Sequence, residues 1–91
     1  MTKEEMEVAT IVLNSKVEVI KRTDGGQVRR YFLNGVLRME AGAKGEFPDG
    51  PFVVFYPSGA TWIKGSFTAG ARDFKQWLIF SPEGEPISAR G

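Results

Sequence analysis

The 91-residue sequence contains no cysteine and no histidine. Without cysteine the chain forms no disulfide and no thiolate metal site. Without histidine it lacks the commonest general base and metal ligand. No apolar run approaches the roughly 18 residues of a membrane-spanning helix. The sequence therefore predicts a protein with no cofactor, no metal and no transmembrane segment.

Catalytic motifs are also missing. Neither a Gly-x-Gly-x-x-Gly nor a Walker sequence is present to hold phosphates. Three serines have no histidine to activate them: Ser58, Ser66 and Ser81. Among the carboxylates Glu46, Asp49 and Asp73, the two aspartates lie at predicted turns, where Asp commonly bonds its own backbone. We therefore expect a protein that is not an enzyme.

The N-terminal residues Met-Thr-Lys-Glu-Glu-Met-Glu are too acidic for a signal peptide and lack its apolar region. We expect a cytoplasmic protein. Hydrophobic residues make up 42% and charged residues 25%, the balance of an ordinary globular chain. The length fits a single domain, residues 1–91.

Glycine and aromatic residues are plentiful, with 11 glycines and 7 phenylalanines. Glycine at this density indicates many turns, and aromatic residues favour strands. Turn signals lie at residues 14–15, 24–26, 34–35, 49–50, 58–59 and 83–84. The sequence therefore predicts an all-β fold, an antiparallel meander of stacked hairpins.

Three turns have specific chemistry. Asp24-Gly25 and Asn34-Gly35 are dipeptides that favour the primed turns of tight hairpins. In residues 56–59, Pro57 at the second position and Gly59 at the fourth predict a type I turn that ends with Gly59 in positive φ.

The N-terminal segment has two interpretations. Residues 7–13 are rich in β-branched side chains, which predicts a strand there and makes residues 1–30 an N-terminal hairpin region. The alternative is a short helix, because Thr2 and Glu5 form a capping-box pattern and Met6, Ala9 and Leu13 continue a helical stripe.

The second part of the chain is repetitive. Aligning Asn34-Gly35 with Ser58-Gly59 gives a spacing of 24 residues, and aligning Ser58-Gly59 with Glu83-Gly84 gives 25. The units are residues 31–57 and 58–80, followed by a partial repeat and tail at 81–91. Each unit is a turn, a strand, a turn and a strand, and such hairpins must stack to bury a face.

These units resemble the MORN family of β-hairpin repeats, in particular its bacterial antitoxin-component branch. The matching positions are Asn34, Gly35, Leu37, Glu40, Asp49, Gly50, Pro51, Phe52, Tyr56, Pro57, Ser58, Gly59, Gly65, Phe67 and Gly70. Ala41 and Phe74 stand where the family has glycine. The resemblance implies a twisted antiparallel meander without an active site, used as a scaffold that contacts proteins or lipids.

Two predicted strands, residues 52–56 and 76–80, are apolar on both of their faces. Such strands are covered on both sides. A single sheet from so short a chain cannot cover both of its own faces, so we expect a protein partner or self-association.

Alternation places Trp62 on the face opposite Thr61 and Ile63, beside Lys64, as an exposed aromatic anchor for a partner. The candidate partner-binding residues are Trp62, Phe55, Tyr56, Trp77, Arg29, Arg30 and Arg38.

The expected function is a non-catalytic protein-interaction module, such as a scaffold or a small inhibitor or antitoxin-like protein, that acts through a sheet face or edge. The alternative is a binder of nucleic acid or lipid headgroups, because residues 16–44 carry seven Lys or Arg against three Asp or Glu. The basic hairpin at residues 16–38 would then make the contact.

Overall fold

The computed structural model describes residues 3–73 and 77–87. One helix, α1 (Lys3–Asn14), precedes the strands. The strands are β1 (Lys16–Lys21), β2 (Gln27–Leu33), β3 (Val36–Lys44), β4 (Phe47–Phe55), β5 (Thr61–Thr68), β6 (Ala71–Arg72), β7 (Leu78–Phe80) and β8 (Pro86–Ile87). Thr2 of the predicted cap, and Phe74 and Gln76 of the second repeat, lie outside the described residues.

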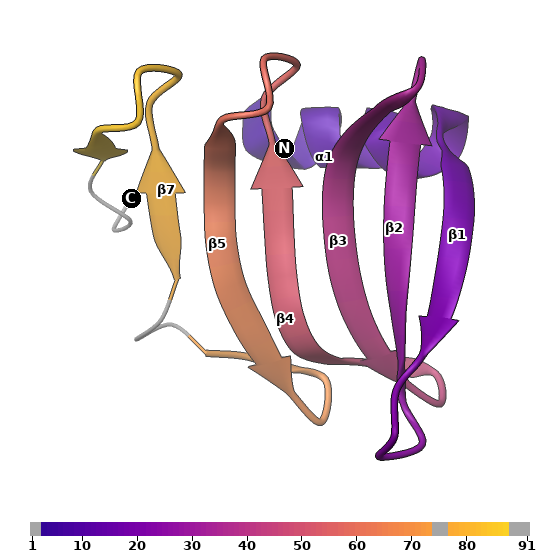
Figure 1. Ribbon diagram of the computed structural model, residues 1–91. Helices are drawn as coiled ribbons and strands as arrows, with labels where there is room; N and C mark the ends of the chain where they lie inside the picture. Colours follow the sequence, from indigo (N-terminus) through magenta and orange to yellow (C-terminus); the bar gives the residue numbers. More distant parts are fainter. Residues whose placement is uncertain (1–2, 74–76, 88–91) are drawn as a thin grey trace.

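The strands form one antiparallel sheet in the order β1-β2-β3-β4-β5-β7-β8, and β6 pairs with the end of β5. Consecutive strands from β1 to β5 are neighbours, joined by short turns at the two ends of the sheet (Figure 1). The predicted all-β antiparallel meander is therefore confirmed.

The predicted strand at residues 7–13 is wrong, because these residues belong to α1. Val8 and Ile11 are three residues apart on one face of the helix, where Ile11 is buried and Val8 packs against the core. Tertiary packing of this face outweighs the β-preference of the individual side chains. The helix ends at Asn14, and Ser15 N–H donates to Ile11 O at the junction with β1.

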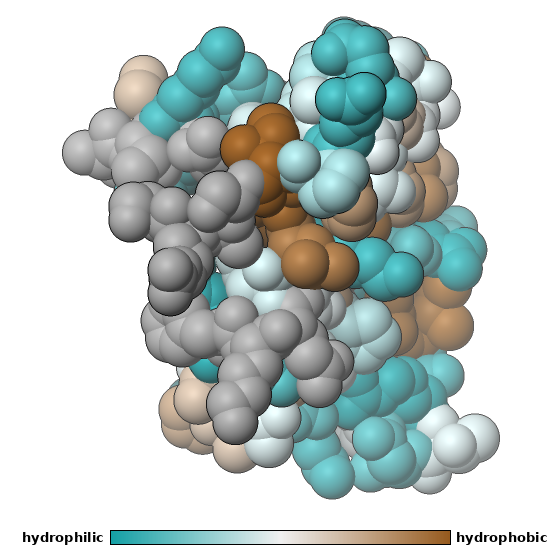
Figure 2. Space-filling model, turned by 90° about the vertical axis from the view of Figure 1, so that its left-hand side faces the viewer, coloured by the Kyte–Doolittle hydropathy of each residue, from teal (hydrophilic) through white to brown (hydrophobic). Residues whose placement is uncertain are grey.

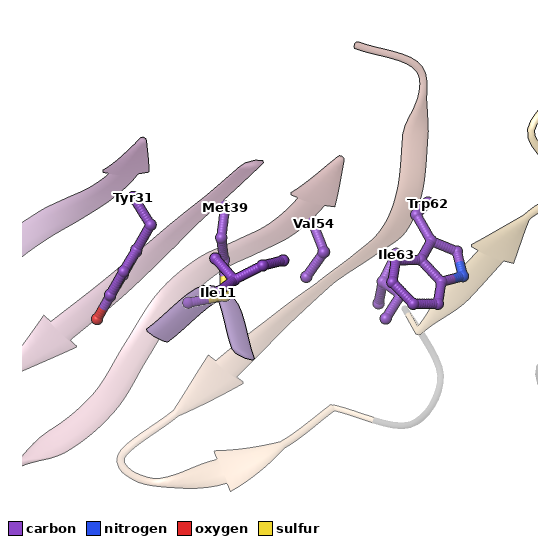
Figure 3. Packing of buried hydrophobic residues seen from close by; sticks show 6 residues of the cluster. All are labelled: Ile11, Tyr31, Met39, Val54, Trp62 and Ile63. Atoms are coloured by element: carbon purple, nitrogen blue, oxygen red, sulfur yellow. The ribbon is translucent and has the colours of Figure 1, made fainter. Parts of the chain in front are cut away.

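The helix lies across one face of the sheet, behind the strands in Figure 1. Its Ile11 enters a cluster of side chains that all project from the strands toward α1 (Figure 3). The buried members of this cluster are Ile11, Tyr31, Met39, Val54, Trp62 and Ile63. Cross-strand pairing of Tyr31 with Met39, and of Met39 with Val54, places one residue of each strand in line beneath the helix.

The register shifts at three places in the sheet, one of them between Ala41 and Ala43 of β3 where it pairs with β4. The β2–β3 register shifts between Tyr31 and Phe32, which leaves Arg38 as an extra residue in β3. The β4–β5 register shifts between Val54 and Phe55, which leaves Trp62 as an extra residue in β5. Arg38 and Trp62 are 24 residues apart, so each repeat carries its bulge at the same position.

The bulge in β5 overturns the predicted exposure of Trp62. Trp62 and its neighbour Ile63 both project to the helix side (Figure 3), and Trp62 is only 5% exposed. A bulge places two residues opposite one and so breaks the strict alternation on which the prediction rested.

The turns agree with the sequence at residues 34–35 and 58–59 and differ from it at residues 49–50. Gly59 has φ 95° and its N–H donates to Tyr56 O, as predicted. Asn34 and Gly35 both have positive φ, which confirms the primed turn. The predicted turn at residues 49–50 is wrong, because both lie inside β4 and the chain reverses around Gly45 instead.

The hairpin at Asp24-Gly25 is present, but its turn is of another kind than predicted. Arg22 N–H donates to Gly26 O across a three-residue loop, and only Gly25 of the pair has positive φ. This is the three-residue loop that ends in a left-handed glycine.

Candidate interaction surface

The face of the sheet opposite α1 is not covered by any described element (Figure 1). We call it the open face. Because Tyr31, Met39 and Val54 point to the helix, their neighbours in the strands, apart from Arg38 at the bulge of β3, point to the open face. These neighbours include both charged and apolar side chains.

A row of paired residues crosses the middle of the open face from β1 to β7. Its members are Glu18, Arg30, Glu40, Val53, Lys64 and Leu78. Arg30 donates from Nε to Glu40 Oε2 at 2.8 Å, and its Nη1 lies 3.8 Å from Glu18 Oε1. Opposite charges on neighbouring strands stabilise the sheet and hold the Arg30 side chain against it.

An apolar group shares Val53 with this row and extends beyond it. Phe32 pairs with Leu37 across β2 and β3, and Val53 and Phe55 flank the buried Val54 in β4. All four side chains are partly buried by their neighbours, although no described element lies over them. We call Phe32, Leu37, Val53 and Phe55 the open-face patch.

Strand β1 is one edge of the sheet, and all six of its residues are exposed. It pairs with β2 along its whole length without a register shift. Val17 and Val19 lie on the helix side of the sheet, yet they are 47% and 51% exposed. The edge therefore presents apolar side chains together with an unpaired row of backbone groups.

The opposite edge is formed by the short strands β7 and β8. Seen from this side, hydrophobic surface shown in brown lies between hydrophilic surface and the residues drawn in grey (Figure 2). The exposed large apolar residues of these two strands are Leu78 and Ile87.

Trp77 belongs to an aromatic cluster on the helix side of the sheet. Its ring stacks on Phe52 at 5.3 Å between centroids and meets Phe67 edge-on at 5.7 Å. The guanidinium of Arg72 lies 4.8 Å from the Trp77 ring centroid. The ring occupies the space above Gly65, where any Cβ would overlap Trp77 Cε3.

Tyr56 is held in place by two interactions. Its ring stacks on that of Trp62 with centroids 5.2 Å apart, and its hydroxyl donates to Phe80 O at 2.6 Å. Tyr56 therefore joins the end of β4 to β7 on the helix side, away from the open-face patch.

The predicted basic cluster is divided between the two faces. Arg38 is buried on the helix side, donates from Nε to Phe55 O and lies 3.9 Å from Glu7 of α1. Arg29 also lies on that side, where the Gln27 amide, with its oxygen turned toward the guanidinium, accepts from Arg29 Nε and Nη2 at 3.0 and 2.9 Å. Arg30 alone of the three lies on the open face, within its ion-paired row.

Arg22, one of the basic residues of the hairpin at residues 16–38, joins three hairpins at one end of the sheet. It donates from Nε and Nη2 to the Asp24 carboxylate, from Nη1 to Asp49 O and from Nη2 to Asp49 Oδ2. Asp49 Oδ1 accepts from Ala69 N–H in the β5–β6 turn. A Cβ at Gly26, Gly42 or Gly50 would crowd the Arg22 guanidinium, so the three glycines form a cradle for it.

The cradle perturbs both carboxyl groups. Hydrogen bonds from the Arg22 side chain, and then from Gly26 N–H, lower the pKa of Asp24 to about 2. The hydrogen bond from Ala69 N–H, followed by that from Arg22, lowers the pKa of Asp49. Hydrogen bonding to the ionised form favours that form in both cases. No motif in the sequence indicates this arrangement, because Arg22 and Asp49 lie 27 residues apart.

The structure thus leaves Phe55 and Arg30 on the open face and places Tyr56, Trp62, Trp77, Arg29 and Arg38 on the helix side. Within the described ranges, no group of three or more His, Cys, Asp or Glu side chains gathers as a metal site. In the same residues no helix is long and apolar enough to cross a membrane. Comparisons of the chain with protein-family models, curated proteins and solved structures find no match.

Proposed function

We propose that this protein is a non-catalytic interaction module that binds another protein through the open face of its sheet. The observation that carries the proposal is the open-face patch, where four apolar side chains lie in neighbouring strands with no described element above them. Clustered apolar surface of this kind is typical of protein-binding sites.

The neighbouring charges suit such a role. Glu18 and Glu40 are both ion-paired with Arg30 within the sheet. A partner therefore would not need a surface of strong opposite charge to bind there. An apolar centre beside polar, ion-paired residues matches the usual core-and-rim arrangement of protein interfaces. The resemblance to MORN-type repeats, as scaffolds, agrees with this proposal.

Polyanion binding through residues 16–38 remains the second candidate and receives less support. Arg22 and Arg30 are ion-paired, and Arg38 is buried beside Glu7. Cations already neutralised within the molecule release few counterions from a nucleic acid, so they contribute little to binding.

The test is affinity capture from the source cell, followed by identification of bound proteins. Phe55→Lys places a charge in the open-face patch, and Leu13→Lys adds the same charge at an exposed position of α1. We expect a partner that binds the native chain and Leu13→Lys but not Phe55→Lys, provided that both variants keep the native circular dichroism.

Equal capture by Phe55→Lys and the native chain would contradict the open face as the binding site. Binding of nucleic acid that weakens steeply between 50 mM and 200 mM salt would favour the second candidate instead.

A further inference from the structure

Strand β1 lacks most of the devices by which proteins protect an open sheet edge. Such edges are commonly short, bulged or interrupted by proline. β1 has six residues, a continuous register with β2 and no proline. Its lysines stand at the two ends, Lys16 and Lys21, which leaves Val17, Val19 and Ile20 exposed between them.

The hydrogen-bond pattern shows which backbone groups of β1 point outward. Arg22 N–H donates to Gly26 O, so this pair faces inward between β1 and β2. In an antiparallel ladder, hydrogen-bonded and non-bonded pairs alternate along the strand. The backbone groups of Val17, Val19 and Lys21 therefore point away from β2, toward the free edge.

We propose that two copies of this chain pair through β1, antiparallel, about a two-fold axis at Val19. This register places Val19 opposite Val19 of the second copy, and Val17 opposite Lys21 of the second copy. All three outward-pointing residues of each strand are then paired, which gives about six hydrogen bonds because each bonded pair exchanges two. The two sheets join into one.

Charge and hydrogen bonding select this register over its nearest alternatives. Pairing must keep the helix sides of both sheets together, so the next allowed axes pass through Glu18 and Ile20. The axis at Glu18 sets Glu18 opposite Glu18 of the second copy, which is destabilising. The axis at Ile20 leaves Val17 without a partner in β1 of the second copy, so fewer hydrogen bonds form. The axis at Val19 sets Glu18 opposite Ile20 of the second copy. Its like-charged pair, Lys16 with Arg22 of the second copy, lies at the strand ends, where Arg22 is already ion-paired with Asp24 and Asp49.

The side chains also fit the Val19 axis. Val17 and Val19 are about half exposed, and pairing brings the valines of both copies together on the helix side. The Lys21 stem covers Val17 of the second copy while its ammonium group stays in water. An edge of six residues is small compared with stable interfaces, so the dimer should dissociate on dilution.

The first test uses the absence of native cysteine. Val19→Cys should oxidise to a covalent dimer, because bonded antiparallel pairs have Cα atoms about 5.5 Å apart, within the range for disulfides. Glu18→Cys is the matched control for the alternative register. Faster cross-linking of Glu18→Cys, or equal slow cross-linking of both, would overturn the proposed axis.

The second test measures the mass in solution of variants that carry a charge at position 19. By light scattering, the native chain should rise from 10.1 kDa toward twice that mass as its concentration increases. Val19→Lys and Val19→Glu should each lose this rise, and a mixture of the two should recover it. Val36→Lys adds the same charge at an exposed position in β3 and should behave as native.

A native chain that stays at 10.1 kDa throughout, or a mixture that fails to recover the rise, would overturn the dimer. Partner binding through the open face and dimer formation through β1 use different parts of the sheet, so either proposal can fail without the other. Phe55→Lys should abolish partner binding and leave the dimer intact, whereas Val19→Lys should do the reverse.

Discussion

Gly59 is required by its backbone conformation alone. It has φ 95°, and a Cβ there would meet no atom within 4 Å. Gly59→Val should therefore destabilise the fold by about 1 kcal/mol or more, since positive φ is costly for a branched residue. Chemical denaturation would measure the loss.

Gly59→Asn is the control, because Asn tolerates the left-handed region and should cost less than Val. Equal stability of the native chain and Gly59→Val would show that the turn can adopt another conformation.

Gly65 is required for a different reason, namely the Trp77 ring above it. Gly65→Ala should cost about 1–3 kcal/mol, as overpacking of a well-packed site usually does. Indole fluorescence should change as the ring is displaced. In a Trp77→Ala background the same substitution should cost much less, and an unchanged cost in that background would contradict the contact.

Acid should weaken the Arg22 cradle. The pKa of Asp24 is about 2 in the folded protein, below the ordinary value of 3.8, and that of Asp49 is also lowered. A lowered folded pKa contributes stability that is present above the ordinary value and is lost as pH falls through the folded one. Stability should therefore fall between about pH 4 and pH 2.

Urea midpoints measured across this range would check the expectation. Arg22→Gln removes the cation that both carboxylates share, so its midpoint should fall less steeply with acid than that of the native chain. Parallel curves for the two proteins would show that other groups cause the acid sensitivity.

At the scale of the element, α1 is held to the sheet chiefly by Ile11, which is 1% exposed. Ile11→Ala should destabilise by about 2–5 kcal/mol, as for other large-to-small changes in a core. Leu13→Ala, in the same helix at 80% exposure, should change stability little. Thermal unfolding of both variants would test whether the buried face of α1 stabilises the sheet.

Strand order and most turns were predictable because their signals are local. Asn34-Gly35 and Gly59 determine turns through their own φ angles, and alternating side chains then identify strands between turns. The turn around Gly45 was missed because Asp49-Gly50 is the stronger local signal. In the structure that pair lies within β4, where Gly50 has positive φ and Asp49 binds Arg22.

The candidate site was only partly predictable. Phe55 and Arg30 follow the alternation of their strands and lie on the open face. Trp62 and Arg38 do not, since each is the extra residue of a β-bulge, and a bulge depends on pairing with the neighbouring strand. Arg22 binds the nearby Asp24 but also Asp49, 27 residues away, and no local pattern identifies that second partner.

At the scale of the whole molecule, α1, the helix of the described residues, covers only one face of the sheet. The 12 residues of α1 among 91 are well below a quarter of the chain. The expectation that the strands have apolar side chains on both faces is met in β4, where Val54 lies under α1 and Val53 and Phe55 lie on the open face. This asymmetry is what distinguishes the two sides of the molecule as core and surface.

The meander order also bears on how the chain folds. Each strand of β1 to β5 pairs with the one before it, so the sheet can grow in the direction of synthesis with short loop closures, which favours rapid folding. α1 precedes the strands in the chain, but Ile11 packs in a cluster that extends to Trp62 and Ile63 of β5. We therefore expect α1 to complete its packing late, after most of the sheet has formed.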